Sequence, residues 1–134
     1  TPAFELALSV VFESGIQHFG LVPAEYDSMP DFLINYLQEV PTAWDETRLA
    51  AGFPGEYVVM ARRSGDTWYI GGINGTGQPK ELTLDLSFLP KDAAATMIID
   101  GPNRTFLKAP LDAAALRSLT INMKTNGGFV IVTE

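Results

Sequence analysis

The chain has 134 residues, of which 46% are hydrophobic and 19% charged, so it is long enough for one core and too apolar for a disordered tail. Nine basic and 16 acidic residues give a net charge of −7, which repels phosphate backbones and anionic lipid headgroups. We therefore expect neither a nucleic-acid nor a membrane partner, and the absence of cysteine excludes disulfides and thiolate metal sites.

The first predicted element is a helix that runs from Thr1 to about Glu13. Thr1 suits the N-cap position, Pro2 suits the first helical position, and most residues that follow are apolar. The run is too short to span a membrane and has no basic residue before it, so we interpret it as a buried helix and not as a signal peptide. Such a helix has almost no polar face and needs cover on most sides, so we expect further protein upstream of residue 1.

A second helix is predicted after an isolated apolar stretch. Residues 16–22 follow Ser14-Gly15 and have the character of a short strand without sibling strands nearby. Ser28 and Asp31 have the spacing of a capping box. The apolar residues that follow recur on one helical face as far as Pro41, namely Phe32, Leu33, Tyr36, Leu37 and Val40.

From Glu56 onward the pattern is that of β-strands. Six runs rich in β-branched and aromatic residues are separated by turns that contain Gly, Asn or Pro, at residues 56–62, 67–74, 80–88, 95–100, 118–124 and 129–133. Apolar and polar residues alternate in two of these runs, with Leu82, Leu84, Leu86, Leu119, Ile121 and Met123 on the predicted buried face. The chain is therefore predicted to be mainly β, an antiparallel β-sandwich preceded by two helices.

Three stretches resemble glycoside hydrolase family 97, the α-glucosidase and α-galactosidase family. Residues 44–75, which include Trp-Asp-Glu-Thr-Arg and Gly-Asp-Thr-Trp-Tyr-Ile-Gly-Gly-Ile-Asn-Gly, resemble its junction between catalytic barrel and C-terminal β-domain. Residues 127–131, Gly-Gly-Phe-Val-Ile, resemble its last strand, and residues 6–17 resemble a late helix of its barrel. The resemblance implies that residues 1–43 are the last elements of a (β/α)₈ barrel, residues 44–55 a linker and residues 56–134 a C-terminal β-sandwich. Residues 16–20 are then the eighth barrel strand.

The resemblance also implies a function. The chain is expected to be the C-terminal structural domain of a hydrolase of α-linked glucosides or galactosides, with the preceding barrel as its partner and an α-linked oligosaccharide as the ligand of the parent enzyme. The catalytic carboxylates of the family lie upstream of residue 1, so no catalytic residue is assigned here. This segment is expected to have no cofactor and no metal site, calcium is expected in the parent enzyme, and the location is expected to be periplasmic or extracellular.

Three residues are candidates for contact with substrate. Active sites of such barrels form at the C-terminal ends of the strands, which places Gln17 and His18 near a sugar pocket on the barrel mapping. Glu13 is the one acidic residue near the expected strand, whereas glycosidases need two carboxylates. The alternatives are that His18, the single histidine, is structural and that Glu13 is a solvated carboxylate.

Other polar residues have simpler interpretations. Asp45, Glu46 and Asp66 lack the spacing of a calcium loop, and we expect residues 45–48 to form ion pairs that fix the linker against the barrel. The run Asn74-Gly-Thr matches a glycosylation acceptor, but Asn-Gly is also a common hairpin turn, which is the interpretation we favour.

Two alternative functions remain open at this point, a carbohydrate-binding module and an interaction domain without a sugar ligand. Trp68 and Tyr69 are adjacent and point to opposite faces of one strand, so at most one is expected in the core. The other is either a platform for a sugar ring or a cover for the interface with the barrel, and we favour the interface. The apolar surface of residues 1–40 is expected to lack cover within this chain, so that the isolated segment forms a homodimer through it or is poorly ordered there.

Overall fold

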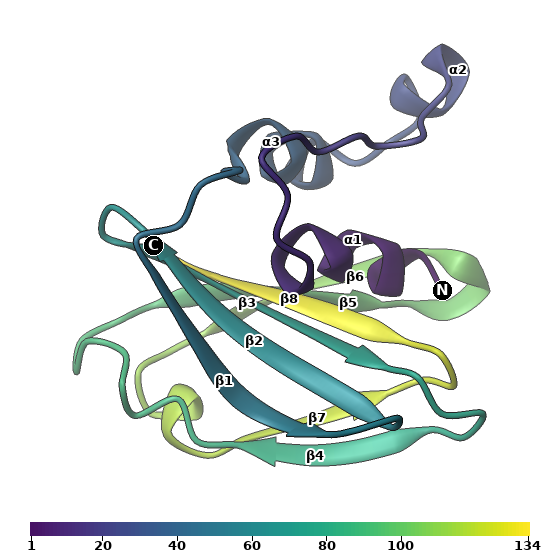
Figure 1. Cartoon of the computed structure of the whole chain (residues 1–134). Helices are drawn as coiled ribbons and strands as arrows, with labels where there is room; N and C mark the ends of the chain where they lie inside the picture. The colour runs from purple at the N-terminus through teal and green to yellow at the C-terminus, as the bar shows by residue number, and fades with distance from the viewer.

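The computed structural model describes residues 1–134 as a two-layered antiparallel β-sandwich with helices over one face (Figure 1). The larger sheet has six strands in the order β1-β2-β3-β8-β5-β6. Their bounds are β1 Glu46–Phe53, β2 Tyr57–Ser64, β3 Thr67–Asn74, β8 Gly128–Thr133, β5 Ala95–Asp100 and β6 Phe106–Leu111. The smaller sheet pairs β4 (Lys80–Leu84) with β7 (Leu119–Met123). The helices are α1 (Pro2–Val11), α2 (Pro23–Tyr26) and α3 (Asp31–Glu39), none of which has the length and apolar character of a membrane span.

The main core lies between the two sheets. All six predicted strands form, and those predicted at residues 67–74 and 95–100 have those bounds. The alternation in β4 and β7 is confirmed, because its apolar members are buried and face the larger sheet. The largest fully buried side chains of this core are Phe129, Ile70, Leu86, Leu116, Ile121, Met123 and Ile131.

Two strands were not predicted, and both are edges of the larger sheet. Residues 44–55 are not a linker, because residues 46–53 form β1, which pairs with β2 from Glu46 to Phe53 with a bulge between Leu49 and Ala51. The run of β6 contains Pro110, which lacks an amide hydrogen and fits only where a strand has a free edge. Both runs are poorer in the β-branched and aromatic residues that mark central strands, with Thr47 and Phe53 in β1 and Phe106 in β6.

Helix α1 packs on the outer face of the larger sheet, against β3 and β8 (Figure 1). Two glycines make this approach possible, since a Cβ on Gly71 would lie 2.7 Å from the Cβ of Val10, and one on Gly128 would lie 2.7 Å from the Cα of Phe4. A second core forms there from residues of α1, α3 and the sheet: Leu6, Ala7, Val10, Leu33, Tyr36, Val40, Tyr69, Ile98 and Val130. The expectation that residues 1–40 have no cover within this chain is therefore wrong for α1, which is an integral layer of the sandwich.

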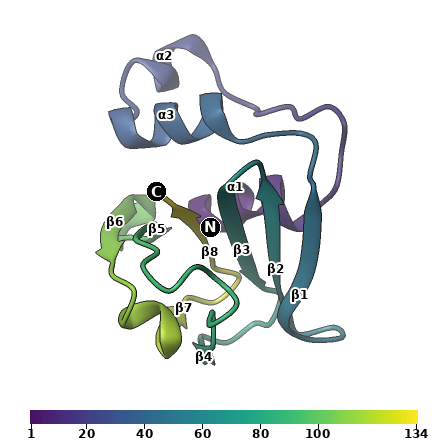
Figure 2. The same ribbon diagram turned by 90° about the vertical axis from the view of Figure 1, so that its left-hand side faces the viewer.

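The remaining helical segment lies farther from the sheet, with α2 and α3 above α1 (Figure 2). Residues 16–20 are not a strand in this structure, since no strand of this chain lies beside them and they run as a largely exposed connection. The second helix forms at residues 31–39, but Ser28 is not its N-cap. Pro30 occupies that position, and the Ser28 hydroxyl donates instead to the carbonyl of Glu25.

Candidate functional site

A groove lies on the helical side of the molecule, between α1, residues 12–21, α2 and α3. Its volume is about 780 Å³, and half of its lining residues are hydrophobic. Ser9 of α1 and Tyr36 of α3 join its two walls through a hydroxyl–hydroxyl hydrogen bond of 2.7 Å. Burial raises the pKa of Tyr36 well above its ordinary value, against a smaller opposite effect of the Ser9 hydrogen bond. The hydrogen bond between Ser9 and Tyr36 thus holds α1 and α3 together beside the groove.

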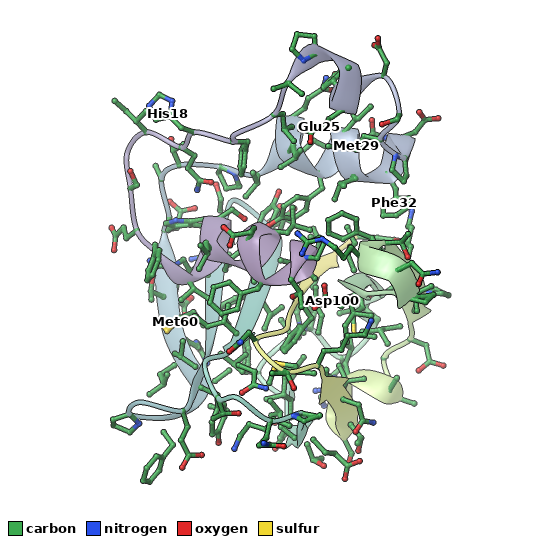
Figure 3. The ribbon with its side chains drawn as sticks, turned by 90° about the vertical axis from the view of Figure 1, so that its right-hand side faces the viewer. His18, Glu25, Met29, Phe32, Met60 and Asp100 are labelled. Carbon is green, nitrogen blue, oxygen red and sulfur yellow. The ribbon has the colours of Figure 1, made fainter.

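The structure brings two of the three sequence-predicted site residues to this groove. Gln17 and His18 both line it, whereas Glu13 does not. The side-chain amide of Gln17 donates to the carbonyl of Ser9 at 2.8 Å, so Gln17 ties the connection to α1. His18 is exposed, with no hydrogen-bond partner within the chain, and lies across the helical layer from Glu25 and Met29 (Figure 3). Glu25 also lines the groove but was not among the predicted site residues. The spacing of residues in the sequence does not show that α2 lies near α1.

Glu13 belongs to a different cluster, which fastens the C-terminal end of α1 to the sheet. Arg62 of β2 is buried, and its Nε donates to the carbonyl of Val10 at 2.7 Å. One Nη of Arg62 donates to the Thr47 hydroxyl at 3.0 Å and lies 3.3 Å from the carboxylate of Glu13, which is 75% exposed. A cation at a helix C-terminus is stabilised by the backbone carbonyls that have no intrahelical donor. This placement favours the solvated, structural interpretation of Glu13.

The N-terminal end of α1 is fastened by a buried carboxylate. Asp100, at the end of β5, accepts hydrogen bonds from the Thr1 hydroxyl at 2.6 Å, the amide of Ala3 at 2.9 Å and the amide of Gly128 at 3.1 Å. Thr1 is the N-cap of α1, and the amide of Ala3 is in its first turn, where backbone amides lack intrahelical acceptors. Asp100 therefore joins α1 to β8, and α1 is held to the sheet at both ends.

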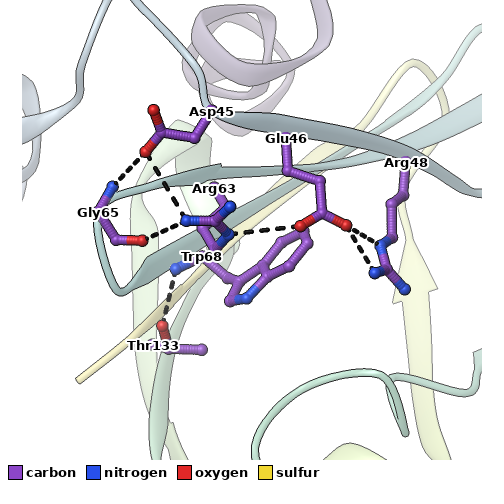
Figure 4. A network of polar contacts seen from close by, with 7 residues as sticks. All are labelled: Asp45, Glu46, Arg48, Arg63, Gly65, Trp68 and Thr133. Atoms are coloured by element: carbon purple, nitrogen blue, oxygen red, sulfur yellow. Dashed lines mark hydrogen bonds and ion pairs between the residues drawn. The ribbon is translucent and has the colours of Figure 1, made fainter.

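The acidic residues at the start of β1 form a network of ion pairs with β2 (Figure 4). Glu46 accepts from Arg48 at 2.6 Å and from Arg63 at 3.4 Å, and Asp45 lies 3.7 Å from Arg63. Hydrogen bonding from Arg48 is the main reason that the pKa of Glu46 lies below its ordinary value. The predicted ion pairs thus exist, but they fasten β1 to β2 and the turn at Gly65. No group of three or more His, Cys, Asp or Glu side chains is arranged to hold a metal ion.

Asn74 stabilises the connection from β3 to β4 in place of a hairpin. Its side-chain amide is fully buried and donates to the carbonyls of Gln78 at 2.8 Å and Lys124 at 2.9 Å. Its carbonyl oxygen accepts from both the amide and the hydroxyl of Thr76. The favoured hairpin interpretation is therefore wrong, because β3 and β4 belong to different sheets and this segment connects them. The buried amide nitrogen of Asn74 is not accessible as a glycosylation acceptor.

Trp68 and Tyr69 are both buried, each in a different core. Trp68 lies between the sheets, in edge-to-face contact with Phe88 and with Arg48 5.4 Å from its ring centroid. Tyr69 lies on the opposite face under the helices, in edge-to-face contact with Trp44. The expectation that at most one of the two is in a core is wrong, because the helices provide a second core. Neither ring is available to stack on a sugar, and Tyr69 packs against the helical side of this same chain.

The chain is thus an antiparallel β-sandwich with a helical layer, in which the clusters around Asp100, Arg62 and Glu46 fasten strands and helices to one another. The model of the family described as glycosyl-hydrolase 97 C-terminal, oligomerisation, matches residues 43–134. The chain belongs to this family of C-terminal domains.

Proteins of known sequence agree with this assignment. The chain is 37% identical over 131 residues to a probable retaining alpha-galactosidase of Streptomyces bingchenggensis, and 35% identical over 133 residues to a retaining alpha-galactosidase of Bacteroides thetaiotaomicron. These matches cover 97% and 95% of this chain. The chain spans only 20% of the length of each of these relatives.

Solved structures show the same arrangement of helices and sandwich. A beta-arabinopyranosidase matches 97% of this chain with a TM-score of 0.85 and 31% identity, and this chain covers 20% of that protein. A glycoside hydrolase family 97 enzyme of Pseudoalteromonas sp. strain K8, solved with acarbose, matches 98% of this chain with a TM-score of 0.82 and 30% identity, and this chain covers 22% of that protein. These matches extend over α1 to α3 as well as the sandwich.

Proposed function

We propose that the chain is the C-terminal structural domain of a larger glycoside hydrolase that acts on α-linked galactosides, and that it is not catalytic alone. The observation that carries this proposal is the 37% identity along nearly the whole chain to a probable retaining alpha-galactosidase five times as long. The second curated relative has the same activity in its name. α-Linked glucosides are the alternative substrate class, which the acarbose complex of a family 97 structure supports.

The partner of the helical side, on this proposal, is the catalytic barrel that precedes residue 1 in the parent enzyme. Nine large hydrophobic side chains of the chain are exposed, and six of them fall between residues 12 and 26: Phe12, Ile16, Phe19, Leu21, Val22 and Tyr26. Exposed apolar side chains concentrated in one segment of the chain indicate an interaction site. In the parent enzyme residues 16–20 would pair as the eighth barrel strand, and the barrel would cover this surface.

The candidate substrate contacts follow from the same placement. In a (β/α)₈ barrel the active site lies at the C-terminal ends of the strands, so His18 and the residues after it are nearer to a sugar than residues before the strand. We propose His18 as a hydrogen-bond donor to a sugar hydroxyl, and Gln17 as the residue that positions it through the carbonyl of Ser9. Glu13 precedes the strand and pairs with Arg62, and it is the weakest of the three candidates.

Two further proposals concern the parent enzyme, namely the position of its calcium ligands and its cellular location. The residues of this chain do not form a cluster suited to calcium, so we propose that the calcium ligands of the parent enzyme lie in its barrel. We also propose a periplasmic or extracellular location, where oligosaccharides would reach the enzyme. The absence of cysteine is compatible with an oxidising compartment.

The test compares residues 1–134 with the longer enzyme that contains them. Both are incubated with nitrophenyl α-galactoside and nitrophenyl α-glucoside. The longer enzyme is expected to cleave the galactoside, and the isolated chain is expected to give only the blank rate, because glycosidases need a pair of carboxylates across the bond. Turnover that co-purifies with the isolated chain and disappears in Glu13→Gln would contradict the proposal.

The burial of Trp68 and Tyr69 weighs against the carbohydrate-binding module. Isothermal titration of the isolated chain with galactosides and maltooligosaccharides is expected to show no saturable binding at submillimolar concentration. The interaction-domain alternative is supported by the matched family, which is described as a C-terminal domain for oligomerisation. We propose that the domain also contributes to self-association of the parent enzyme.

A further inference from the structure

We propose that the barrel helix directly before α1 in the parent enzyme packs in a notch between α1 and the edge strand β1. This α1–β1 notch is formed by Phe4 of α1 and by Leu49, Val58, Met60 and Ile73 of the larger sheet. The inference rests on the proposed function, because it needs a barrel upstream of residue 1. It adds a contact surface that is separate from residues 12–26 and names the element that covers it.

The strands of the notch turn these side chains toward the helical side. Val59 and Ala61 of β2 are buried in the main core between the sheets. Val58 and Met60 alternate with them and are therefore on the opposite face, where α1 lies. Leu49 is the partner of Met60 in the β1–β2 ladder and shares this face.

The same side chains have little cover within the chain. Leu49 is 67% exposed, and the three side chains from β2 and β3 are half-buried. Helix α1 packs over β3 and β8 and leaves β1 uncovered (Figure 1). Met60 lies at the margin of the molecule, away from α2 and α3 (Figure 3). Gly52 lies opposite Val58 and has no side chain, and both residues line a groove of about 490 Å³ that also includes Ile73.

The flank of α1 beside the notch is apolar as well. Ser9 lies on the other flank, where its hydroxyl is hydrogen-bonded to Tyr36 of α3. Phe4 and Val11 are seven residues apart, so two helical turns place them on one flank, and both are only half-buried. Val11 is next to β2, since its carbonyl accepts a hydrogen bond from Arg62 at 3.4 Å. One element in the notch would therefore cover this flank and the sheet together.

The order of helices in a barrel identifies the occupant. In a (β/α)₈ barrel each strand is followed by a helix, and the helices form an outer ring in sequence order. With residues 16–20 as the eighth strand, α1 is the seventh helix and α3 is the eighth. Because α3 packs beside α1 on the flank of Ser9, the sixth helix belongs on the opposite flank, which is the α1–β1 notch.

The spacing and the charge of the notch also suit a helix. Neighbouring strands are about 4.8 Å apart, so β1 lies about 10 Å from β3 across the sheet. The axes of packed helices are about 8 to 10 Å apart, so a helix beside α1 would lie over β1 and β2. The only charged side chain on this face of β1 and β2 is that of Arg62, which is buried. The notch therefore fits the apolar face of a helix.

A second copy of the chain is a less suitable occupant. In a two-fold contact the same surface is present on both molecules. Two concave notches that face each other would leave a void, whereas a convex helix fills a groove to the density of a protein interior. Self-association of the parent enzyme would then use another surface.

The first experiment measures how fast engineered cysteines in the longer enzyme react with a maleimide. Leu49→Cys is expected to react roughly 100-fold more slowly than Leu107→Cys, because the reagent reaches residue 49 only when the contact opens. Leu107 is the matched control, since it is a leucine 52% exposed on β6, at the opposite edge of the sheet from β1. The 134 residues contain no cysteine of their own, so mass spectrometry of the labelled peptide assigns the rate. Similar rates for the two variants would overturn the inference.

The second experiment identifies the neighbour of Leu49. The photoreactive residue p-benzoylphenylalanine replaces Leu49 in the longer enzyme, which is irradiated and then digested. The expected product has the mass of one chain in denaturing electrophoresis and joins residue 49 to a peptide of the helix that precedes α1. A product of twice that mass would place a second copy in the notch. That result, attachment to any other upstream peptide, or a yield no higher than with the same replacement at Leu107 would each overturn the inference.

These readouts separate the inference from the proposed function, because neither depends on catalysis. A longer enzyme that gives the expected cross-link but does not cleave α-galactosides would contradict the proposed function alone. An active enzyme in which residue 49 reacts freely would overturn the inference alone. Met60→Cys repeats the labelling from the neighbouring strand if the variants at Leu49 do not fold.

Discussion

Arg62 and Arg63 are neighbours on β2, yet their side chains have opposite environments. Arg62 is buried and donates to carbonyls at the end of α1, whereas Arg63 is part of the solvent-exposed network around Glu46. Removing a buried charged donor leaves its acceptors unsatisfied, while an exposed ion pair contributes little. The two residues therefore offer a matched comparison within one strand.

We expect Arg62→Ala to lower the free energy of unfolding by about 3 kcal/mol, because the carbonyl of Val10 and the Thr47 hydroxyl lose their donor. Arg63→Ala is expected to cost less than about 1 kcal/mol. Urea denaturation followed by circular dichroism measures both values. Equal losses in the two variants would show that Arg62 does not fasten α1.

The pKa of Glu46 provides a test of the exposed network. Its pKa is lowered mainly by the hydrogen bond from Arg48, so Arg48→Gln is expected to move it upward, toward its ordinary value. A carboxylate whose pKa is lower in the folded state stabilises the fold above its unfolded pKa, and this contribution disappears as the pH falls through the folded pKa. Carbon-13 NMR titration of the side-chain carboxyl measures the change. An unchanged midpoint in the variant would contradict the geometry of this pair.

At the residue scale, the sequence predicted which side chains of a strand are buried better than it predicted which residues contact one another. Periodicity predicted which side chains of β4 and β7 are buried, because alternation in a strand determines the face. It did not predict that both Trp68 and Tyr69 are buried, since that requires a helix on the far face of the sheet. The pairing of Glu13 with Arg62, 49 residues away, has no local pattern at all.

At the scale of elements, the central strands were predicted and the edge strands were not. Central strands are buried on one or both faces, so their sequences contain apolar runs that predict a strand. β1 and β6 form only one set of ladder bonds, which tolerates a bulge at Leu49 in one and Pro110 in the other. Residues 16–20 show the converse, because an apolar run forms a strand only where another strand is available to pair with it.

The packing of α1 on β8 gives a prediction for a single glycine. A Cβ at Gly128 would lie 2.7 Å from the Cα of Phe4 and 2.8 Å from the carbonyl oxygen of Ala3, both of which are backbone atoms. Gly128→Ala is therefore expected to displace α1 and lower the free energy of unfolding by about 3 kcal/mol.

The control for this prediction is Gly77→Ala, because a Cβ there meets nothing within 4 Å. It is expected to change the free energy of unfolding by less than about 0.5 kcal/mol. Thermal unfolding and the near-ultraviolet spectrum, which reports on Trp44 and Tyr69 beneath the helices, measure both variants. A silent Gly128→Ala would mean that α1 does not rest on β8.

In the whole molecule, the larger sheet is covered on both faces by other elements of the chain, and an apolar segment stays exposed. The smaller sheet covers one face of the larger sheet and α1 covers part of the other, which accounts for both cores. Residues 12–26 have no comparable cover and concentrate six of the nine exposed large hydrophobic side chains. The assignment of this segment to a barrel stays a prediction, because residues 16–20 do not form a strand here.

Hydrogen exchange can determine whether residues 16–20 become a barrel strand in the longer enzyme. In the isolated chain, the only hydrogen bond from an amide of residues 13–22 to a backbone carbonyl runs from Leu21 to Phe19. The amides of Ile16 and Val22 donate only to the nearby side chains of Ser14 and Glu25, so the amides of this segment are expected to exchange rapidly. If neighbouring strands of a preceding barrel pair with the segment, its amides are expected to exchange at least 100-fold more slowly in the longer enzyme. The amides of β3 are the control, because they are already paired on both sides and are expected to be protected in both proteins. Rapid exchange of residues 16–20 in an active longer enzyme would show that this segment is a surface connection and that the catalytic domain contacts the sandwich elsewhere.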